Sequence, residues 1–251
     1  MSLERDTNNY YSIIQGEIIK TTPFEMVFII RDNMTYEELK KDEAIRTYIT
    51  QADASLGALG FTEHSFPHVC RVAEMTGYLL KTMGYPARTV ELGKIAGYLH
   101  DIGNLVNRVD HSQSGAIMAF RILDKRNFAP EECSLVVTAI GNHDEGTGVP
   151  VNALAAALIL ADKSDVRRSR VRAKETADFD IHDRVNYSVT QSQLEINDDH
   201  TTVTLKLTVD TAFSTVLDYF AIFTNRMLLC RQAAKTLGMQ FKLMINGQQL
   251  G

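Results

Sequence analysis

Apolar residues recur at helical spacing along most of residues 35 to 166. Between residues 65 and 84, for example, Val69, Val72, Leu79 and Met83 fall on one face of a helix. Ser65 is the expected N-cap there, and Pro130 and Asn152 are start signals for two later helices. The pattern predicts helices over residues 35–60, 65–84, 89–102, 114–125, 130–142 and 152–165. A run of helices without a clear strand predicts a helical bundle.

After about residue 177 the apolar residues recur at every second position, which is the period of a β-strand. Residues 184–196 and 203–209 alternate between apolar and polar positions, and the polar turn 197–200 separates them, which is typical of a β-hairpin. A long amphipathic helix over 214–237 ends before Gly238, and residues 239–246 alternate again. The sequence therefore predicts a mainly α protein, with a helical bundle followed by a small C-terminal α+β unit of ββαβ order.

Three regions follow from these patterns. We expect a largely helical N-terminal extension over residues 1–60, the helical bundle over 61–175 and the ββαβ subdomain over 176–251. The arginine-rich stretch 167–174 is the predicted boundary between the last two. The apolar run 26–30 fits either a strand or a helical turn, because five residues do not reveal a period.

Composition narrows the class of protein. The net charge of -5 gives no global field that would favour nucleic acid, which weakly disfavours a nucleic-acid partner. Three widely spaced cysteines indicate reduced thiols in a cytoplasmic protein. The first 25 residues lack a signal-peptide pattern, and the longest apolar run, 153–161, is too short to span a bilayer. We expect a cytoplasmic protein without a membrane partner.

Ionisable residues fall at or near the ends of successive predicted helices. These residues are His68, His100, Asp101, His111, His143 and Asp162. A bundle can converge such side chains on one central site, and mixed imidazole and carboxylate donors suit Mn, Fe, Zn or Ni. A single histidine at a helix end is more often a satisfied surface or core residue. The adjacent His100 and Asp101 weigh against that alternative, because burying both directly after an apolar stripe is costly unless something coordinates them.

Four segments carry a family resemblance. They are His68-Val-Cys-Arg-Val-Ala, Leu99-His-Asp-Ile-Gly103, Asn142-His-Asp-Glu145 and Ala161-Asp-Lys-Ser-Asp165, and over about residues 62–172 they resemble the HD phosphohydrolase superfamily. The resemblance implies that His68, His100, Asp101 and Asp162 are metal ligands, with Asp101 bridging two ions. His111 and His143 match the histidines that hold a second ion in two-metal members. One or two divalent ions (Mn, Fe, Zn, Ni or Mg) are therefore expected.

The same resemblance bears on the substrate. Residues 146–150 are similar to the Gly-Tyr-Pro loop of the cyclic-dinucleotide phosphodiesterase branch, but that branch has Lys at the position of Asn104, His at Asn142 and Tyr at Val149. These departures favour a small phosphorylated molecule or a nucleotide as substrate. The leading hypothesis is a metal-dependent phosphohydrolase that cleaves a phosphate ester or anhydride with activated water. The alternative is a non-catalytic regulatory protein that binds a metal or a ligand.

Further residues are candidates for catalysis and binding. We expect Asp101, His100, Arg71 and Lys163 to act in catalysis. Arg167 and Arg168 are expected to bind phosphate; the alternative, for these and for Arg170 and Arg172, is a solvated helix end.

Other polar residues have weaker signals. His64 is expected to be a helix-entry residue, and a substrate-binding role is the alternative. Asp144 and Glu145 are expected to be loop carboxylates, and proton donation is the alternative. His182 and His200 lie in the C-terminal unit, outside the group of expected metal ligands. The C-terminal unit should shape the mouth of the site, dock a partner or form a homodimer contact, with its last strand at a sheet edge.

Overall fold

The computed structural model describes residues 10–14, 17–21, 28–29, 34–172 and 180–250. The chain divides into two units, Met1–Met34 and Thr35–Gly251. In the first, β1 (Tyr10–Ile14), β2 (Glu17–Thr21) and β3 (Phe28–Ile29) form an antiparallel sheet in that order. The predicted helical extension over 1–60 is therefore wrong for these strands, whose short β-branched and aromatic runs carry no helical period. Within the ambiguous run 26–30, residues 28–29 are a strand and the others lie outside the described residues.

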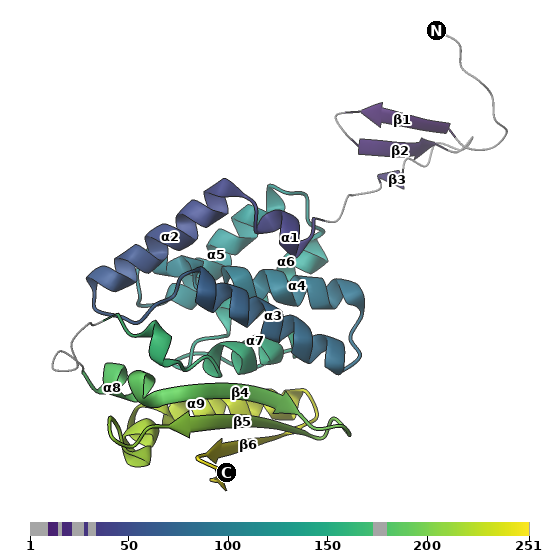
Figure 1. Cartoon of the computed structure of the whole chain (residues 1–251). Helices are drawn as coiled ribbons and strands as arrows, with labels where there is room; N and C mark the ends of the chain where they lie inside the picture. The colour runs from purple at the N-terminus through teal and green to yellow at the C-terminus, as the bar shows by residue number, and fades with distance from the viewer. Residues whose placement is uncertain (1–9, 15–16, 22–27, 30–33, 173–179, 251) are drawn as a thin grey trace. The chain divides into compact units, whose positions relative to one another are not determined.

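The second unit opens with the predicted mainly helical bundle (Figure 1). Its helical elements are α1 (Tyr36–Leu39), α2 (Glu43–Ala58), α3 (Phe66–Thr82), α4 (Ala87–Leu99), η1 (Ile102–Leu105), α5 (His111–Asp124), α6 (Pro130–Gly141), α7 (Ala153–Lys163) and η2 (Arg168–Arg170). The single helix predicted over 35–60 is two helices, because Asp42 caps a new start by accepting hydrogen bonds from the backbone of Ala44 and Ile45. No described helix is both long and apolar enough to cross a membrane.

Two of the predicted N-caps have different outcomes. Asn152 caps α7 as expected, with its side chain accepting from the backbone N–H of Ala155. Ser65 does occupy the N-cap position of α3, but its side chain makes no capping bond and instead donates to Glu63 Oε1. Helix α7 is buried along its whole length and contacts α3, α4 and α6. It therefore forms the centre of the bundle, and its last residues, Asp162 and Lys163, are buried with it.

The C-terminal part is a four-stranded sheet with two helices. Its elements are α8 (Ile181–Ser188), β4 (Val189–Ile196), β5 (Thr202–Val209), α9 (Val216–Thr236), β6 (Gln240–Ile245) and β7 (Gln248–Gln249). The strands lie in the order β4-β5-β6-β7, with β5 and β6 parallel and α9 as their crossover. Helix α9 contacts both the sheet and α7 of the bundle (Figure 1). The C-terminal unit is thereby held against the helix that carries Asp162.

Two details differ from the predicted ββαβ unit. Residues 184–188 belong to a helix and not to the first strand, because Asp180 caps α8 and continues the chain as a helix to Ser188. The strand β6 is also not an open edge over its whole length, since β7 pairs with Met244 and Ile245. The homodimer contact through this strand stays a prediction.

Candidate metal centre

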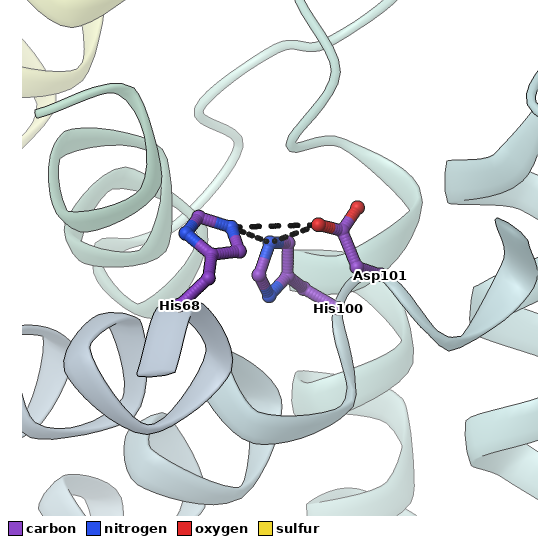
Figure 2. A group of neighbouring side chains, drawn as sticks. All are labelled: His68, His100 and Asp101. Atoms are coloured by element: carbon purple, nitrogen blue, oxygen red, sulfur yellow. Dashed lines mark hydrogen bonds and ion pairs between the residues drawn. The ribbon is translucent and has the colours of Figure 1, made fainter. Parts of the chain in front are cut away.

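Three helices bring four polar side chains to one buried point. His68 lies in α3, His100 and Asp101 directly follow α4, and Asp162 lies in α7. The Nε2 atom of His68 is 3.4 Å from Asp101 Oδ2 and 3.4 Å from Asp162 Oδ1. The Nε2 atom of His100 is 3.1 Å from the same Asp101 oxygen (Figure 2). His68 and His100 are 0% exposed and Asp101 and Asp162 are 5% and 9% exposed, so the imidazoles are shielded from solvent while the carboxylates keep a small exposed area.

A second pair of histidines lies on the other side of Asp101. His111 is the first residue of α5, and His143 follows the end of α6. Their Nε2 atoms are 3.2 Å apart and lie 3.5 Å and 3.9 Å from Asp101 Oδ1. Asp101 thus directs one carboxylate oxygen to His68 and His100 and the other to His111 and His143. The donors form three overlapping groups, and two of these, His68 with His100 and Asp101 and Asp101 with His111 and His143, share the Asp101 carboxylate.

The ring nitrogens on the far side of each imidazole are fixed by hydrogen bonds. His100, His111 and His143 donate from Nδ1 to the backbone carbonyls of Gly97, Arg108 and Ile140, at 2.8, 3.0 and 2.6 Å. A carbonyl oxygen only accepts, so Nδ1 carries the hydrogen in all three rings. Their Nε2 lone pairs consequently point into the cluster, which is the orientation that a metal ligand requires.

Such a cluster needs positive charge. The Nε2 atoms of His68 and His100 are 3.3 Å apart, and two facing lone pairs repel unless a proton or a cation lies between them. Burial disfavours the imidazolium of His100, but the carboxylates of Asp101 and Asp162 outweigh it and raise the pKa of His100 to about 10. Burial and the neighbouring charges of His143 and Arg108 instead lower the pKa of His111 to about 4, against the pull of Asp101. Metal ions loading this site would displace a proton from the His100 side.

The glycine of the His-Asp-Ile-Gly motif has a packing role. A Cβ atom on Gly103 would lie 1.9 Å from the backbone oxygen of His111 and 2.4 Å from the backbone nitrogen of Gly115. Only a glycine allows η1 and the start of α5 to approach this closely. The motif therefore positions His111 as well as supplying His100 and Asp101.

Lys163 links the cluster to the C-terminal unit. Its Nζ atom is 2.7 Å from Asp162 Oδ2 and 2.6 Å from Glu145 Oε2, and Glu145 in turn pairs with Arg226 of α9 at 3.3 Å. Burial disfavours the charged amine, but Asp162 and Glu145 raise the pKa of Lys163 above its usual value. The lysine is therefore a cation that balances Asp162, which leaves Oδ1 of that carboxylate directed at His68 and His100.

A cavity of about 380 Å³ opens onto the cluster. Its walls include residues 59–62 between α2 and α3, residues of α8, and Phe223 and Arg226 of α9. Asp101, His111, His143 and Asp162 line its floor together with Lys163. The expectation that the C-terminal unit shapes the mouth agrees with this geometry. No residue of that unit belongs to the groups of donors found among the described residues.

The structure brings all six expected ligands together, but not all of the expected cations. Arg71 pairs with Asp165 at 3.0 Å and donates to the backbone oxygen of Ser192. Arg167 also pairs with Asp165, at 2.6 Å, and Arg168 donates to the backbone oxygen of Tyr187 and packs on that ring. None of the three arginines is among the described residues that line the cavity. Their observed contacts are with the protein itself, and their expected roles in catalysis and phosphate binding stay predictions.

Other residues have roles that the sequence reading did not assign. Asp165 accepts from His68 Nδ1 at 2.8 Å, and its only sequence signal was its place in the Ala161–Asp165 motif segment. The cavity is lined by the arginines Arg108, Arg170 and Arg226. It is also lined by His182, which lies outside the group of expected metal ligands. His64 also lines it, with its ring 5.4 Å from that of His68. Their place in the cavity could not be predicted from sequence spacing, because they reach it from separate elements.

Comparison with known proteins identifies the class. Residues 66–187 match the HD domain family model, a span from α3 to α8 that contains all six clustered residues. This part of the chain is an HD domain. An uncharacterized protein of Methanocaldococcus jannaschii is 26% identical over 190 residues, covering 66% of this chain and 73% of that protein. The crystal structure of a predicted HD superfamily hydrolase from an uncultured Thermotogales bacterium is similar over 53% of this chain and 75% of that one, with 23% identity and a TM-score of 0.41.

Proposed function

We propose that this chain is a metal-dependent phosphohydrolase that cleaves a phosphate ester or anhydride in a nucleotide or another small phosphorylated molecule. The observation that carries the proposal is the shared carboxylate. Asp101 directs its two oxygens to two separate histidine pairs, at distances of 3.1 to 3.9 Å. A carboxylate shared between two sets of imidazole donors fits a pair of divalent ions side by side.

The donor set fits such ions. Four imidazole nitrogens and the oxygens of Asp101 and Asp162 meet at one place, and the hydrogen bonds at Nδ1 keep the histidine lone pairs directed inward. This mixture of donors suits Mn, Fe, Zn or Ni, and carboxylate donors also accept Mg. Bound divalent ions would lower the pKa of water and polarise a phosphoryl oxygen, which is the chemistry of metal-assisted phosphate ester hydrolysis.

The surrounding residues fit the same reaction. His68, His100, His111 and His143 would hold the ions, and Lys163 would keep Asp162 oriented toward them by binding its other oxygen. The cavity beside the cluster is of the size that takes a small ligand, and most of the residues that line it are polar or charged. A partly enclosed site limits the access of bulk water to the reacting phosphate and strengthens the electrostatic interactions inside it.

The test is turnover by metal-loaded protein. Protein loaded with Mn²⁺ is incubated with a panel of nucleotides, phosphomonoesters and phosphodiesters, and phosphate or nucleoside release is measured. We expect turnover of at least one class, abolished by chelator and by Asp101→Ala, and retained by Asp210→Ala as a surface carboxylate control. Full ion occupancy without turnover of any class would instead support a regulatory protein and contradict the proposal.

A further inference from the structure

Among the residues that the structure describes, one cation in the cavity has no carboxylate partner. Four lysine and arginine residues line the cavity. Lys163 pairs with Asp162 and Glu145, Arg170 with Asp165, and Arg226 with Glu145. Arg108, which is half-buried, forms no ion pair with any residue that the structure describes. Its charge is therefore available to a ligand in the cavity, whereas the other three are balanced by the protein.

The Arg108 side chain is held in place by neutral groups. Its guanidinium donates to Asn104 Oδ1 at 3.3 Å, and it packs over the ring of Phe61 at 5.4 Å. Asn104 in turn donates to Asp101, to the carboxylate oxygen Oδ1 at 3.0 Å and to the backbone oxygen at 2.9 Å. A chain of two hydrogen bonds thus connects the guanidinium to the shared carboxylate. Neither contact neutralises the charge of Arg108, but both fix where it lies.

The backbone of the same residue is part of the metal centre. The carbonyl oxygen of Arg108 accepts from Nδ1 of His111 at 3.0 Å. The segment that carries the guanidinium is therefore locked to the ring of His111, on the side of Asp101 where His111 and His143 meet. A ligand bound by Arg108 would lie next to that half of the cluster.

These contacts point to an anion. A half-buried guanidinium without a counter-charge is costly, and a ligand that supplies negative charge removes that cost. Only one of its N–H donors is used by Asn104. The planar fork of an arginine matches the oxygens of phosphate in a two-point hydrogen bond. We infer that Arg108 is a substrate-binding residue that takes a phosphoryl oxygen of a small phosphorylated substrate beside the His111 and His143 half of the centre.

This inference rests on the proposed function for the identity of the substrate, but its test does not require turnover. Inorganic phosphate is the probe, and its binding to Mn²⁺-loaded protein is measured by calorimetry at fixed ionic strength. Arg108→Gln should weaken phosphate binding by about tenfold or more, because hydrogen bonds between charged groups are the strong class. Arg108→Lys keeps the charge without the fork and should fall between Arg108→Gln and the wild type. Arg121→Gln removes an exposed arginine of α5 and should bind phosphate as the wild type does.

Metal content and melting temperature are recorded for every variant. Phosphate binding by Arg108→Gln equal to that of Arg121→Gln would overturn the inference, as would wild-type protein that does not bind phosphate. If Arg108→Gln does not fold, Arg108→Lys decides, and wild-type affinity in that variant overturns the inference. If the wild type hydrolyses nothing but Arg108→Gln selectively loses phosphate binding, the result supports Arg108 as an anion-binding residue. In that case only the hydrolase proposal is contradicted.

Discussion

Asp165 Oδ2 accepts a hydrogen bond from His68 Nδ1 at 2.8 Å, and both side chains are fully buried. The bond fixes the ring so that Nε2 points at Asp101 and Asp162. Arg71 and Arg167 bind the other oxygen of Asp165, at 3.0 and 2.6 Å. Burial opposes the charged form of Asp165, but the hydrogen bonds from His68 and Arg167 and the charges of His68 and Arg170 hold its pKa well below its usual value. A carboxylate that orients a metal-binding histidine is thus itself oriented by Arg71 and Arg167, which do not reach the cavity.

Asp165→Asn should weaken metal binding without removing a ligand. An amide is uncharged and no longer binds both arginines as an ion pair, so the ring of His68 loses its fixed acceptor. Loss of such an outer partner costs roughly 10- to 100-fold in metal affinity. Competition with a fluorescent chelator measures the change. Asp210→Asn removes the carboxylate beside Arg168, remote from His68, and should leave the affinity unchanged. Equal affinities for the two variants would contradict the role assigned to Asp165.

The spacing of the ligands, read with the family resemblance, anticipated the metal centre better than its surroundings. His68, His100, Asp101, His111, His143 and Asp162 carried signals because each lies at a fixed place on a helix or at a helix end, and helix geometry limits where such residues point. The cations carried no such signal. Arg71 is one turn past His68 in α3, yet its guanidinium reaches Asp165.

The partners of a long, flexible side chain are decided by tertiary contacts. Arg226 reaches the cavity from α9, far along the sequence from the ligands, and the chain offers no local pattern that would reveal it. The change from helix to strand near residue 188 was missed for a related reason. Alternation of Val185, Tyr187 and Val189 fits a strand, but the cap at Asp180 places the first two in α8.

Substitutions on the two sides of Asp101 should have unequal effects on metal content. His143→Ala removes one imidazole from the half formed with His111 and should cost about one metal equivalent, with the other half retained. Asp101→Ala removes the carboxylate that both halves share and should empty both. Elemental analysis of purified, buffer-exchanged proteins gives the stoichiometry, and circular dichroism checks the fold. If His143→Ala retains as many ions as the wild type, the two-ion arrangement is wrong.

Gly97→Ala should disturb the centre through helix packing. A Cβ atom at this position of α4 would lie 2.6 Å from Cα and 2.8 Å from the backbone nitrogen of Ala73 in α3. The helices would have to separate, at a cost of about 1–3 kcal/mol. Because the carbonyl of Gly97 also fixes His100, metal affinity should fall together with the melting temperature.

Gly57→Ala is the matched control for this substitution. It lies in α2, where the nearest atom to a new Cβ, on Arg172, is at 3.5 Å, an ordinary contact. Alanine is favoured over glycine in a helix by about 1 kcal/mol, so this variant should be as stable as the wild type or more stable. A Gly97→Ala protein as stable as Gly57→Ala would show that α3 and α4 are not packed as closely as described.

Asp42 should make the stability of the bundle depend on pH. It caps α2 and forms an ion pair with Arg126, and this pair and the capping bonds lower the pKa of Asp42 although burial opposes them. A carboxyl whose folded pKa lies below its unfolded value of about 4 stabilises the fold above that pH and loses the contribution as pH falls through the folded value. Asp42→Asn keeps a capping side chain but removes the charge, so it should cost about 0.5–1 kcal/mol at pH 7.

The direction in which the stability difference changes with pH distinguishes an effect of the Asp42 charge from a general loss of structure. In urea titrations, the stability difference between wild type and Asp42→Asn should shrink as the pH is lowered below about 5, because the wild-type carboxylate becomes protonated. Asp183 supplies the opposite case. Burial and the nearby Asp180 raise the pKa of Asp183, so its charge opposes folding at neutral pH and Asp183→Asn should be the more stable protein there. A difference for Asp42→Asn that stays constant down to acidic pH would mean that the amide disturbs the helix cap itself, and that the ion pair with Arg126 contributes nothing measurable.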